Sequence, residues 1–461
     1  MEKFQQIVST IDGWLWGPWL LALLFGSHLY LTVRTGFIQR KLGLGIKLSV
    51  TPDKGATGDV SQFGALTTAL ASTIGTGNIV GVGTAIAAGG PGAVLWMWLT
   101  GVFGIATKYA ESLIAVKYRV KNEKGMMIGG AMFALERGLK MKWLGVLFAI
   151  FAAVAAFGIG SSVQSNAVSR LILENFKVKP EISGIIMMVL AGIVIIGGIK
   201  WISRVCEGLV PIMSVLYTIG CIIILVMHYK YIGPAVAEIL KYAFTPTAMG
   251  GGLLGHTIKE AARFGIARGL FSNESGMGSA PIVAAAAQTR NPTRQALVSM
   301  TGTFWDTVVI CLMTGLVVVS SAIANPNIDY SNGASLVNAA FGQIPYVGRL
   351  VLTFGLITFA FSTILGWSYY GEKSAEYLLG SKVIIPYRIL YTITVFLGCV
   401  MSLNLVWDLA DGLNALMVIP NLIAVLLLSG VIAAETKKYL AGNHIDDVDS
   451  TPIPLRSEIE K

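Results

Sequence analysis

The chain has 461 residues, of which 54% are hydrophobic and only 13% are charged, and its mean hydropathy is +0.70. Soluble domains contain about 45–50% apolar and about 25% charged residues, so this composition excludes a soluble globular protein and predicts a polytopic α-helical membrane protein. The net charge of +9 does not indicate a nucleic-acid partner, because the Lys and Arg residues stand in short clusters between apolar blocks, as membrane topology requires.

A helix needs about 20 apolar residues to span a bilayer, and eleven stretches of the chain are candidates. In chain order they are residues 14–33, 61–89, 92–118, 143–173, 181–199, 205–228, 257–287, 294–322, 346–378, 383–403 and 407–434. The stretches 130–140, 234–244 and 331–343 are too short or too polar to span, and we interpret them as surface helices or loops.

The loops between these spans alternate between rich and poor in Lys and Arg. The richer set comprises residues 34–54, 117–142, 200–204, 290–294, 373–388 and the tail at 437–438. Cytoplasmic loops carry the excess of positive charge, so we expect a multi-pass protein of the cell (plasma) membrane. Its N-terminus would lie outside and its C-terminus in the cytoplasm.

Two of the predicted spans are interrupted by glycines at matching places. The pattern Gly-x-Gly-[Ser/Thr]-Ala occurs at 81–85 in the span 61–89 and again at 276–280 in the span 257–287. The two spans enter the membrane from opposite sides, which is typical of secondary transporters with inverted repeats and broken helices. Irregular backbone at membrane depth is tolerated where it lines a cavity, and its freed N–H groups can hold a carboxylate there. Close helix packing is the alternative use of such glycines.

This repeated glycine pattern predicts how the chain is divided into segments. We expect an N-terminal extra helix with a cytoplasmic connector, a first repeat of five core helices, an extracellular connector, a second repeat of five core helices and a cytoplasmic tail. The corresponding ranges are 1–60, 61–230, 231–256, 257–434 and 435–461.

The run GGPGAVLWMWLTGVFG at residues 89–104 resembles the signature of the alanine/glycine:cation symporter family, with Leu95 where Phe is expected. GTGN, RGLFSNESGMGSAPIVAAAA and GWSYYGEK extend the resemblance over nearly the whole chain. It implies the amino acid–polyamine–cation superfamily and the leucine-transporter-type fold. That fold is all-α, with ten core helices in two inverted fives, here after one extra helix. It also implies symport of alanine and glycine with Na⁺, or with H⁺, by alternating access.

On this resemblance, the first core helix breaks at residues 72–77 and the sixth near 271–276. The freed amides of the first break would hold the substrate carboxylate, and a large aromatic ring from the eighth core helix would limit the substrate side chain. The residues expected at the substrate are Thr73, Gly75, Thr76, Gly77, Asn78, Gln164, Phe271, Ser272, Asn273, Met277 and Trp367. For Asn78 and Gln164 the alternative is a structural role.

The resemblance also implies a Na⁺ site between the first and eighth core helices. Its expected ligands are the carbonyls of Ala71, Ile74 and Phe359 and the hydroxyls of Ser362 and Thr363. The alternative is that both hydroxyls bond back to their own helix. Asn78 and Ser272 are candidates for a second cation site.

Two acidic residues inside the spans are candidates for coupling, because charge at this depth is costly and usually functional. For Glu274 the favoured alternative is a salt bridge with Arg268 or Arg263, or a gate. For Asp306 the favoured alternative is pairing at a helix end. We expect Lys108 and Glu111 to pair on the cytoplasmic side.

Other classes of function receive less support from the residues. Channels usually build filters from rings of subunits, which an asymmetric inverted pair does not match. The sequence has no HExxH motif, no nucleophile–base pair and no metal-ligand spacing among its four cysteines, so we expect no enzyme and no cofactor besides the coupling ion. Partners would be the amino acid, the cation and membrane lipid, with no oligomer required. An H⁺-coupled transporter of another small amino acid is the alternative function.

Overall fold

The computed structural model describes residues 2–53, 55–246, 257–328, 333–344, 347–401, 403–442 and 444–459. In this part the regular structure is helical, apart from the hairpin of β1 (Val120–Lys121) and β2 (Met127–Ile128). The two strands are antiparallel, with Val120 opposite Ile128. The predicted all-α class is confirmed.

The helices up to the end of the first predicted repeat are α1 (Glu2–Leu15), α2 (Pro18–Arg34), α3 (Leu42–Ser49), α4 (Gln62–Thr73), α5 (Val82–Gly89), α6 (Ala93–Lys117), α7 (Ala131–Phe133), α8 (Lys142–Ala155), α9 (Val163–Phe176), α10 (Pro180–Ile196) and α11 (Ile199–Met227). Those that follow are α12 (Tyr229–Phe244), α13 (Ile258–Asn273), α14 (Pro281–Ala284), α15 (Pro292–Thr303), α16 (Leu312–Ala324), α17 (Gly333–Gly342), α18 (Val347–Leu379), α19 (Ile384–Val400), α20 (Leu403–Leu427), α21 (Ser429–Leu440) and α22 (Arg456–Ile459). Wider π-helical turns occupy Gly77–Gly81, Ala134–Gly138, Ala156–Ser162 and Phe304–Cys311.

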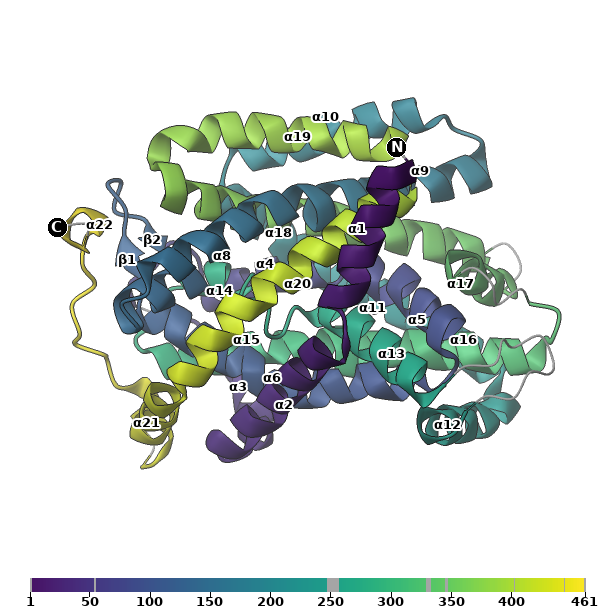
Figure 1. Ribbon diagram of the computed structural model, residues 1–461, viewed down its shortest axis with the longest axis horizontal. Coiled ribbons are helices and arrows are strands. Elements are labelled where there is room, and N and C mark those ends of the chain that lie inside the picture. Colours follow the sequence, from purple (N-terminus) through teal and green to yellow (C-terminus); the bar gives the residue numbers. More distant parts are fainter. Residues whose placement is uncertain are drawn as a thin grey trace.

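The helices pack so that the two predicted broken spans lie in the interior. Helix α6 packs against α13 and α15, and α18 packs against α4, α8 and α11. Helices α10 and α19 lie side by side along the upper edge in Figure 1, and α1 lies beside α20. The functional segments are therefore surrounded by helices rather than exposed on a face.

Among the described residues, seven helical runs are long and apolar enough to cross a membrane, and the bent pair at 62–89 makes eight. The predicted spans 92–118, 181–199 and 257–287 are not in this set, although helices occupy these ranges. The chain is thus a multi-pass membrane protein, whereas the number of eleven spans stays a prediction.

Some element boundaries differ from the prediction. Helix α1 precedes the predicted first span and is continued by α2 after Gly17, where Pro18 begins the new helix. The predicted span 407–434 is divided between α20 and α21 at Leu428. Helices α12 and α17 occupy two of the stretches interpreted as surface elements, 234–244 and 331–343, and α7 lies in the third, 130–140. For 130–140 that interpretation was wrong, because residues 131–135 are buried. Part of the predicted connector 231–256 and part of 331–343 lie outside the described residues.

The first predicted break is present. Ser61 caps α4 by accepting a 2.8 Å hydrogen bond from the Gly64 N–H, and α4 ends at Thr73. The chain becomes helical again at Gly77, and the two halves are bent by 50°. Ile74 has extended backbone (ψ 91°), which turns its carbonyl out of the helix.

The second break begins later than predicted. Helix α13 continues through Asn273, so most of the predicted break lies in its last turn. Glu274 then takes a left-handed conformation (φ 55°), and Gly276 and Gly278 have φ of 97° and 78°. Glycine is the residue that accepts such angles without strain. Pro281 starts α14 at the first helical position, where its missing N–H costs nothing.

The repeated Gly-x-Gly motif does not occupy equivalent places in the two breaks. Residues 81–85 are helical, whereas 276–280 lie inside the second break. A Cβ on Gly83 would clash with the backbone of Gly333 in α17. In the first span this motif therefore permits close packing, and the helix opens several residues earlier.

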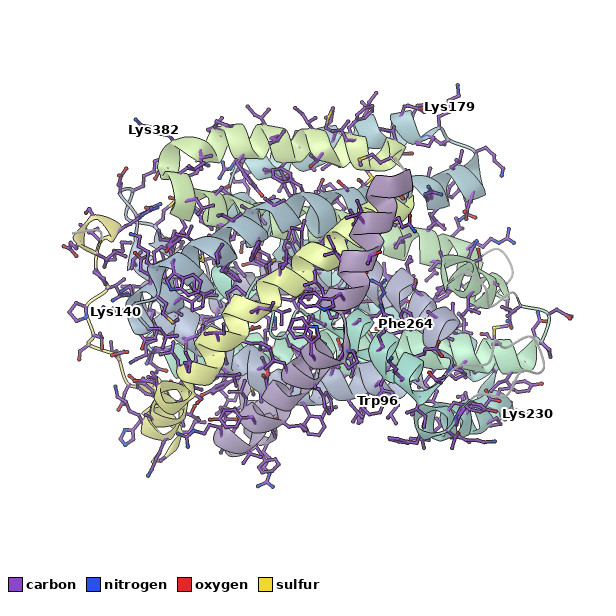
Figure 2. The ribbon with its side chains drawn as sticks, in the orientation of Figure 1. Trp96, Lys140, Lys179, Lys230, Phe264 and Lys382 are labelled. Atoms are coloured by element: carbon purple, nitrogen blue, oxygen red, sulfur yellow. The ribbon has the colours of Figure 1, made fainter. Side chains whose placement is uncertain are left out.

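The two predicted sets of basic loops lie at opposite ends of the molecule. Figure 2 shows Lys140 and Lys382 of the richer set toward the left-hand end, and Lys179 and Lys230 of the poorer set toward the right. We call the first of these the Lys140 end. Its assignment to the cytoplasm remains a prediction.

The tail segment 444–459, which we call the tail strap, crosses the Lys140 end (Figure 1). Asn291 at the start of α15 donates from its Nδ2 to the carbonyls of Ile445 and Asp447, at 2.8 and 2.9 Å. The Lys121 N–H of β1 donates to the Pro454 carbonyl at 2.9 Å. The strap therefore joins elements of both predicted repeats.

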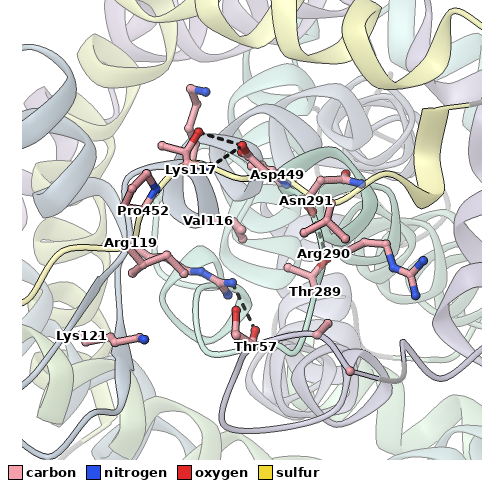
Figure 3. Close-up of a pocket in the computed structure, with 16 residues that line it drawn as sticks. Thr57, Val116, Lys117, Arg119, Lys121, Thr289, Arg290, Asn291, Asp449 and Pro452 are labelled. Atoms are coloured by element: carbon pink, nitrogen blue, oxygen red, sulfur yellow. Dashed lines mark hydrogen bonds between the residues drawn. The ribbon is translucent and has the colours of Figure 1, made fainter.

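A cavity of about 440 Å³ lies beneath the strap (Figure 3). The guanidinium of Arg119 donates there to the carbonyls of Thr57, Ala285 and Ala287 at 3.2, 3.1 and 2.9 Å. Burial lowers the pKa of Arg119 to about 10, so it keeps its charge at neutral pH. Arg119 thereby ties the segment after α14 to the loop before α4.

Candidate functional site

The first break presents two backbone amides to side-chain oxygens. The Gly75 N–H donates to Asn78 Oδ1 at 2.8 Å, and the Thr76 N–H donates to Gln164 Oε1 at 3.2 Å. The Thr76 hydroxyl is buried and has no hydrogen-bond partner within the described residues. A carboxylate accepts hydrogen bonds more strongly than these neutral amide oxygens, so these donors are suited to an anionic group.

The glycines of this break allow neighbouring helices to come close. A Cβ on Gly75 would lie 2.5 Å from Thr363 Oγ1 of α18, and one on Gly77 would lie 3.2 Å from the Phe271 ring of α13. Thr73 is placed differently from the other predicted residues, because its hydroxyl bonds to the carbonyl of Ala69 on its own helix at 3.1 Å.

The predicted residues of α13 line the second break. Asn273 donates from Nδ2 to the Thr307 hydroxyl at 3.1 Å and accepts from the Ser275 N–H at 2.8 Å. Met277 is buried within the break, and its N–H donates to the Glu274 carbonyl at 3.2 Å. These bonds replace the helical ladder that the break interrupts.

Glu274 is buried and is held by hydrogen bonds rather than by an arginine. Trp367 Nε1 donates to its Oε1 at 2.7 Å, and the Ser279 hydroxyl donates to its Oε2 at 2.6 Å. The predicted partner Arg268 instead pairs with Asp411 at 2.9 Å. The expectation of an Arg268–Glu274 salt bridge was therefore wrong.

Asp306 lies at the junction of the two breaks. Its Oδ1 accepts from Asn78 Nδ2 at 2.7 Å, and its Oδ2 accepts from the hydroxyls of Ser272 and Thr307 at 2.9 and 2.6 Å. The expectation of helix-end pairing was wrong, because Asp306 lies inside the run from α15 to α16. The carboxylate brings together Asn78 and Ser272, the candidates for a second cation site.

Cys311 also lies at this junction, although sequence reasoning did not predict it there. Its sulfur lies 3.3 Å from Asn78 Nδ2 and 3.2 Å from the Ser272 hydroxyl. A position one helical turn beyond Asp306 could have suggested it, since residues four or five apart share a face in a π-helical segment.

The five expected Na⁺ ligands form one cluster between α4 and α18. The Thr363 hydroxyl lies 3.0, 3.4 and 2.9 Å from the carbonyl oxygens of Ala71, Ile74 and Phe359. The Ser362 hydroxyl lies 3.2 and 2.9 Å from those of Ala71 and Phe359. Both hydroxyls thus reach across to α4 as well as back along their own helix.

The chemistry of this cluster suits a small hard cation. All five oxygens are neutral, and unwound backbone carbonyls hold Na⁺ in transporters with broken helices. The described residues contain no group of three or more His, Cys, Asp or Glu side chains that could hold a metal ion. The cluster therefore differs from sites that bind divalent metals through charged ligands.

The predicted substrate and cation sites are both closed to solvent in this conformation. Thr73 is the most exposed of the predicted side chains, at 7%, and Trp367 is 0% exposed. Substrate and cation can enter or leave only if the surrounding helices move.

The expected pairing of Lys108 with Glu111 on α6 is confirmed, whereas its cytoplasmic placement stays a prediction. This buried ion pair holds the second break. Lys108 Nζ lies 3.1 Å from Glu111 Oε1 and donates to the Glu274 carbonyl at 3.1 Å. Glu111 Oε2 accepts from the Gly276 N–H at 3.1 Å and from Asn421 Nδ2 at 2.9 Å. Opposite charges three residues apart in an apolar helix indicated that the two side chains pair. The sequence does not show that the pair contacts the second break.

The fold and the site together define the class of protein to which this chain belongs. Two broken helices meet inside a multi-pass helical protein, with amides suited to a carboxylate beside carbonyls and hydroxyls suited to a cation, as in secondary transporters. The fold is similar to that of MhsT, solved in complex with L-phenylalanine, with a TM-score of 0.59 over 83% of this chain and 93% of that chain. At 18% identity this likeness concerns the fold, which is the predicted leucine-transporter type.

Sequence comparison identifies the family. A model described as the sodium:alanine symporter family matches residues 1–450. The chain is 50% identical over 444 residues to the sodium/alanine symporter AgcS of Methanococcus maripaludis, covering 95% of this chain and 97% of the relative. It is 36% identical over 446 residues to the probable sodium/glutamine symporter GlnT of Bacillus subtilis, covering 95% and 91%. The chain belongs to the sodium:alanine symporter family, and the predicted resemblance is confirmed.

Proposed function

We propose that this protein is a Na⁺-coupled symporter that carries alanine and glycine across the cell membrane by alternating access. The observation that carries this proposal is the oxygen cluster of Ser362, Thr363 and three backbone carbonyls. Transport changes no covalent bond in the amino acid. Relatives of the family are named for alanine and for glutamine, so the substrate has to be argued from this chain's own site.

The amino acid binds between the two breaks. Its carboxylate displaces the amide oxygens of Asn78 and Gln164 and accepts from the N–H groups of the first break at Gly75, Thr76 and Gly77. The positive end of a half-helix favours this negative charge. The ammonium group faces the oxygens at the end of α13.

The side chain of the amino acid packs between two aromatic rings, one on α13 and one on α18. Phe271 lies close to Gly77, and Trp367 is fixed by its bond to Glu274. The base of the Trp367 side chain also lies so close to Gly160 that a Cβ there would clash with it. A ring held from both sides cannot move away, so the site admits a methyl group or a hydrogen and excludes longer side chains.

Asp306 favours a second coupling cation. It already contacts both Asn78 and Ser272, and a carboxylate beside the substrate carboxylate needs a positive charge between them. Na⁺ at this place would satisfy both groups. A proton on Asp306 or Glu274 is the H⁺-coupled alternative, whereas the neutral oxygens near Thr363 have no group that takes up a proton at physiological pH.

The two predicted repeats, 61–230 and 257–434, supply the elements that move. Each contributes one broken helix, and rocking around a fixed site alternates access. The Lys140 end faces the cytoplasm, and a single chain contains a complete site, so no oligomer is needed.

The experiment is alanine uptake into liposomes that contain the purified protein, with and without an inward Na⁺ gradient. Thr363→Ala removes a hydroxyl of the cluster. Thr358→Ala on the same helix is the matched control, because its hydroxyl bonds only to Phe354 and Gly355 on that helix. Na⁺-driven accumulation that is lost in Thr363→Ala and kept in Thr358→Ala supports the proposal. Accumulation driven by a pH gradient alone would show that transport is coupled to H⁺, with Asp306 or Glu274 as the proton carrier, and would contradict Na⁺ coupling.

The substrate is tested in the same liposomes by competition. Unlabelled alanine and glycine should inhibit uptake of labelled alanine, whereas glutamine should not. If glutamine competes as well as alanine, the argument from the fixed Trp367 ring is wrong.

A further inference from the structure

A second cavity, of about 700 Å³, lies at the Lys140 end between the end of α2 and α21. Four of the residues that line it are cationic, namely Arg34, Arg40, Lys41 and Lys437, and none is acidic. We call it the basic cavity. It shares no residue with the transport site.

The four cations have no acidic partner in the described structure. The ion pairs described at this end of the molecule use other basic residues, namely Lys117, Arg290 and Arg294. Four like charges around one hollow repel one another unless an anion neutralises them.

Two of the cations can be placed relative to the walls of the cavity. The Arg40 guanidinium lies 5.1 Å from the centre of the Phe37 ring, a cation–π distance. A Cβ on Gly430 would lie 4.0 Å from Arg34 Nη2, so the Arg34 side chain reaches from α2 toward α21. Together with Lys437 on α21, they place positive charge on both walls of the cavity.

The cavity borders on the apolar surface of a spanning helix. The apolar run of α2 ends at Arg34, and the neighbouring Val33 and Phe37 are 67% and 46% exposed. Figure 1 shows the end of α2 and α21 beside each other at the lower left. Cationic groups next to exposed apolar side chains are suited to the boundary of a membrane, where anionic lipid headgroups meet the acyl chains.

We propose that the basic cavity binds the phosphate headgroup of an anionic phospholipid whose acyl chains lie along Val33 and Phe37. The recognised chemistry is a phosphodiester in a headgroup of net negative charge, which a zwitterionic lipid lacks. The adjoining apolar side chains favour a membrane lipid over free phosphate, because free phosphate has nothing to place against them. Basic pockets beside membrane spans bind such headgroups in this manner. The bound lipid would join α2 to α21.

The test uses the full-length protein in neutral detergent with a fluorescent phosphatidylglycerol as the probe. The triple variant Arg40→Gln/Lys41→Gln/Lys437→Gln removes three charges from the basic cavity. The matched control Lys124→Gln/Lys200→Gln/Lys382→Gln removes three exposed charges elsewhere. Competitors are unlabelled phosphatidylglycerol, phosphatidylcholine and inorganic phosphate.

We expect saturable binding that phosphatidylglycerol displaces and phosphatidylcholine does not. The cavity variant should bind at least about ten-fold more weakly, since each basic residue near anionic lipid contributes about 1 kcal/mol. The control variant should bind like the wild type. An equal loss in both variants would show unspecific attraction to surface charge, and displacement by phosphate alone would show a small-anion site. Either outcome overturns the proposal, and neither depends on alanine transport.

Discussion

Trp367 and Glu274 join α18 to the second helix break through a 2.7 Å hydrogen bond between the indole N–H and a carboxylate oxygen. Both residues are buried, at 0% and 1% exposure. The bond fixes an aromatic ring against the proposed amino-acid site and satisfies an acidic group inside the protein. Substrate size and the conformation of the break therefore depend on the same contact.

Replacing Trp367 with Phe should keep a ring of similar shape but remove the donor. Leaving a buried carboxylate oxygen without its donor costs about 1–3 kcal/mol, so we expect a lower melting temperature and a large loss of alanine uptake. Trp98→Phe is the control, because the Trp98 indole N–H has no partner in the described structure. Equal uptake by both variants would show that the Trp367–Glu274 bond is not needed.

Replacing Asp306 with Asn tests the second cation. The amide can keep hydrogen bonds to its neighbours, but it loses the charge that a cation needs. We expect the Na⁺ concentration for half-maximal alanine uptake to rise by about ten-fold, equivalent to about 1.4 kcal/mol. The dependence of uptake on Na⁺ should also become less steep. If the Na⁺ dependence is unchanged while uptake falls, Asp306 has a structural role only.

The buried pair of Lys108 and Glu111 should be costly to break from one side. Removing one partner leaves a buried charge uncompensated, which costs about 3–5 kcal/mol, so Lys108→Met and Glu111→Gln should each lower the free energy of unfolding strongly. The double variant should lose less than the sum of the two. Lys142→Met breaks the pair with Glu136, in which Lys142 is 59% exposed, and should cost less than about 1 kcal/mol. Additive losses at positions 108 and 111 would contradict the coupling.

The tail strap should loosen when Arg456 is replaced by Ala. Arg456 donates to the carbonyls of Glu376 and Tyr377 at 2.6 and 2.8 Å, and these bonds hold the last described residues against α18. Hydrogen exchange followed by mass spectrometry should show faster exchange in 444–459. Lys124→Ala in the turn of the β-hairpin is the control and should leave exchange in the strap unchanged. Unchanged exchange in Arg456→Ala would mean that the contacts of Asn291 suffice.

Sequence patterns predicted the fold class because hydrophobicity and glycine placement reflect local requirements. A broken helix needs residues that tolerate unusual backbone, and glycines at 75, 77, 276 and 278 mark both breaks. The exact start of the second break was missed because it depends on Glu274. A glutamate gives no signal for a left-handed conformation, and its bonds to Lys108, Ser279 and Trp367 hold it there.

The partners of buried charges could not be predicted in the same way. Asp306 bonds to Asn78, 228 residues away in the chain, and Arg268 pairs with Asp411, 143 residues away. Such pairs depend on which helix faces come together, and a single sequence does not contain that information. The five-oxygen cluster was expected only because the family resemblance supplied it.

The most direct test of the central claim is equilibrium binding of labelled alanine to the purified protein, measured as a function of Na⁺ concentration at constant ionic strength. If the two ligands share one closed site, each must raise the affinity for the other by the same factor. We therefore expect alanine binding to strengthen as Na⁺ replaces choline in the wild type and in Thr358→Ala, and to depend much less steeply on Na⁺ in Thr363→Ala, which keeps only the cation proposed at Asp306. Alanine affinity that is independent of Na⁺ in the wild-type protein would contradict the account.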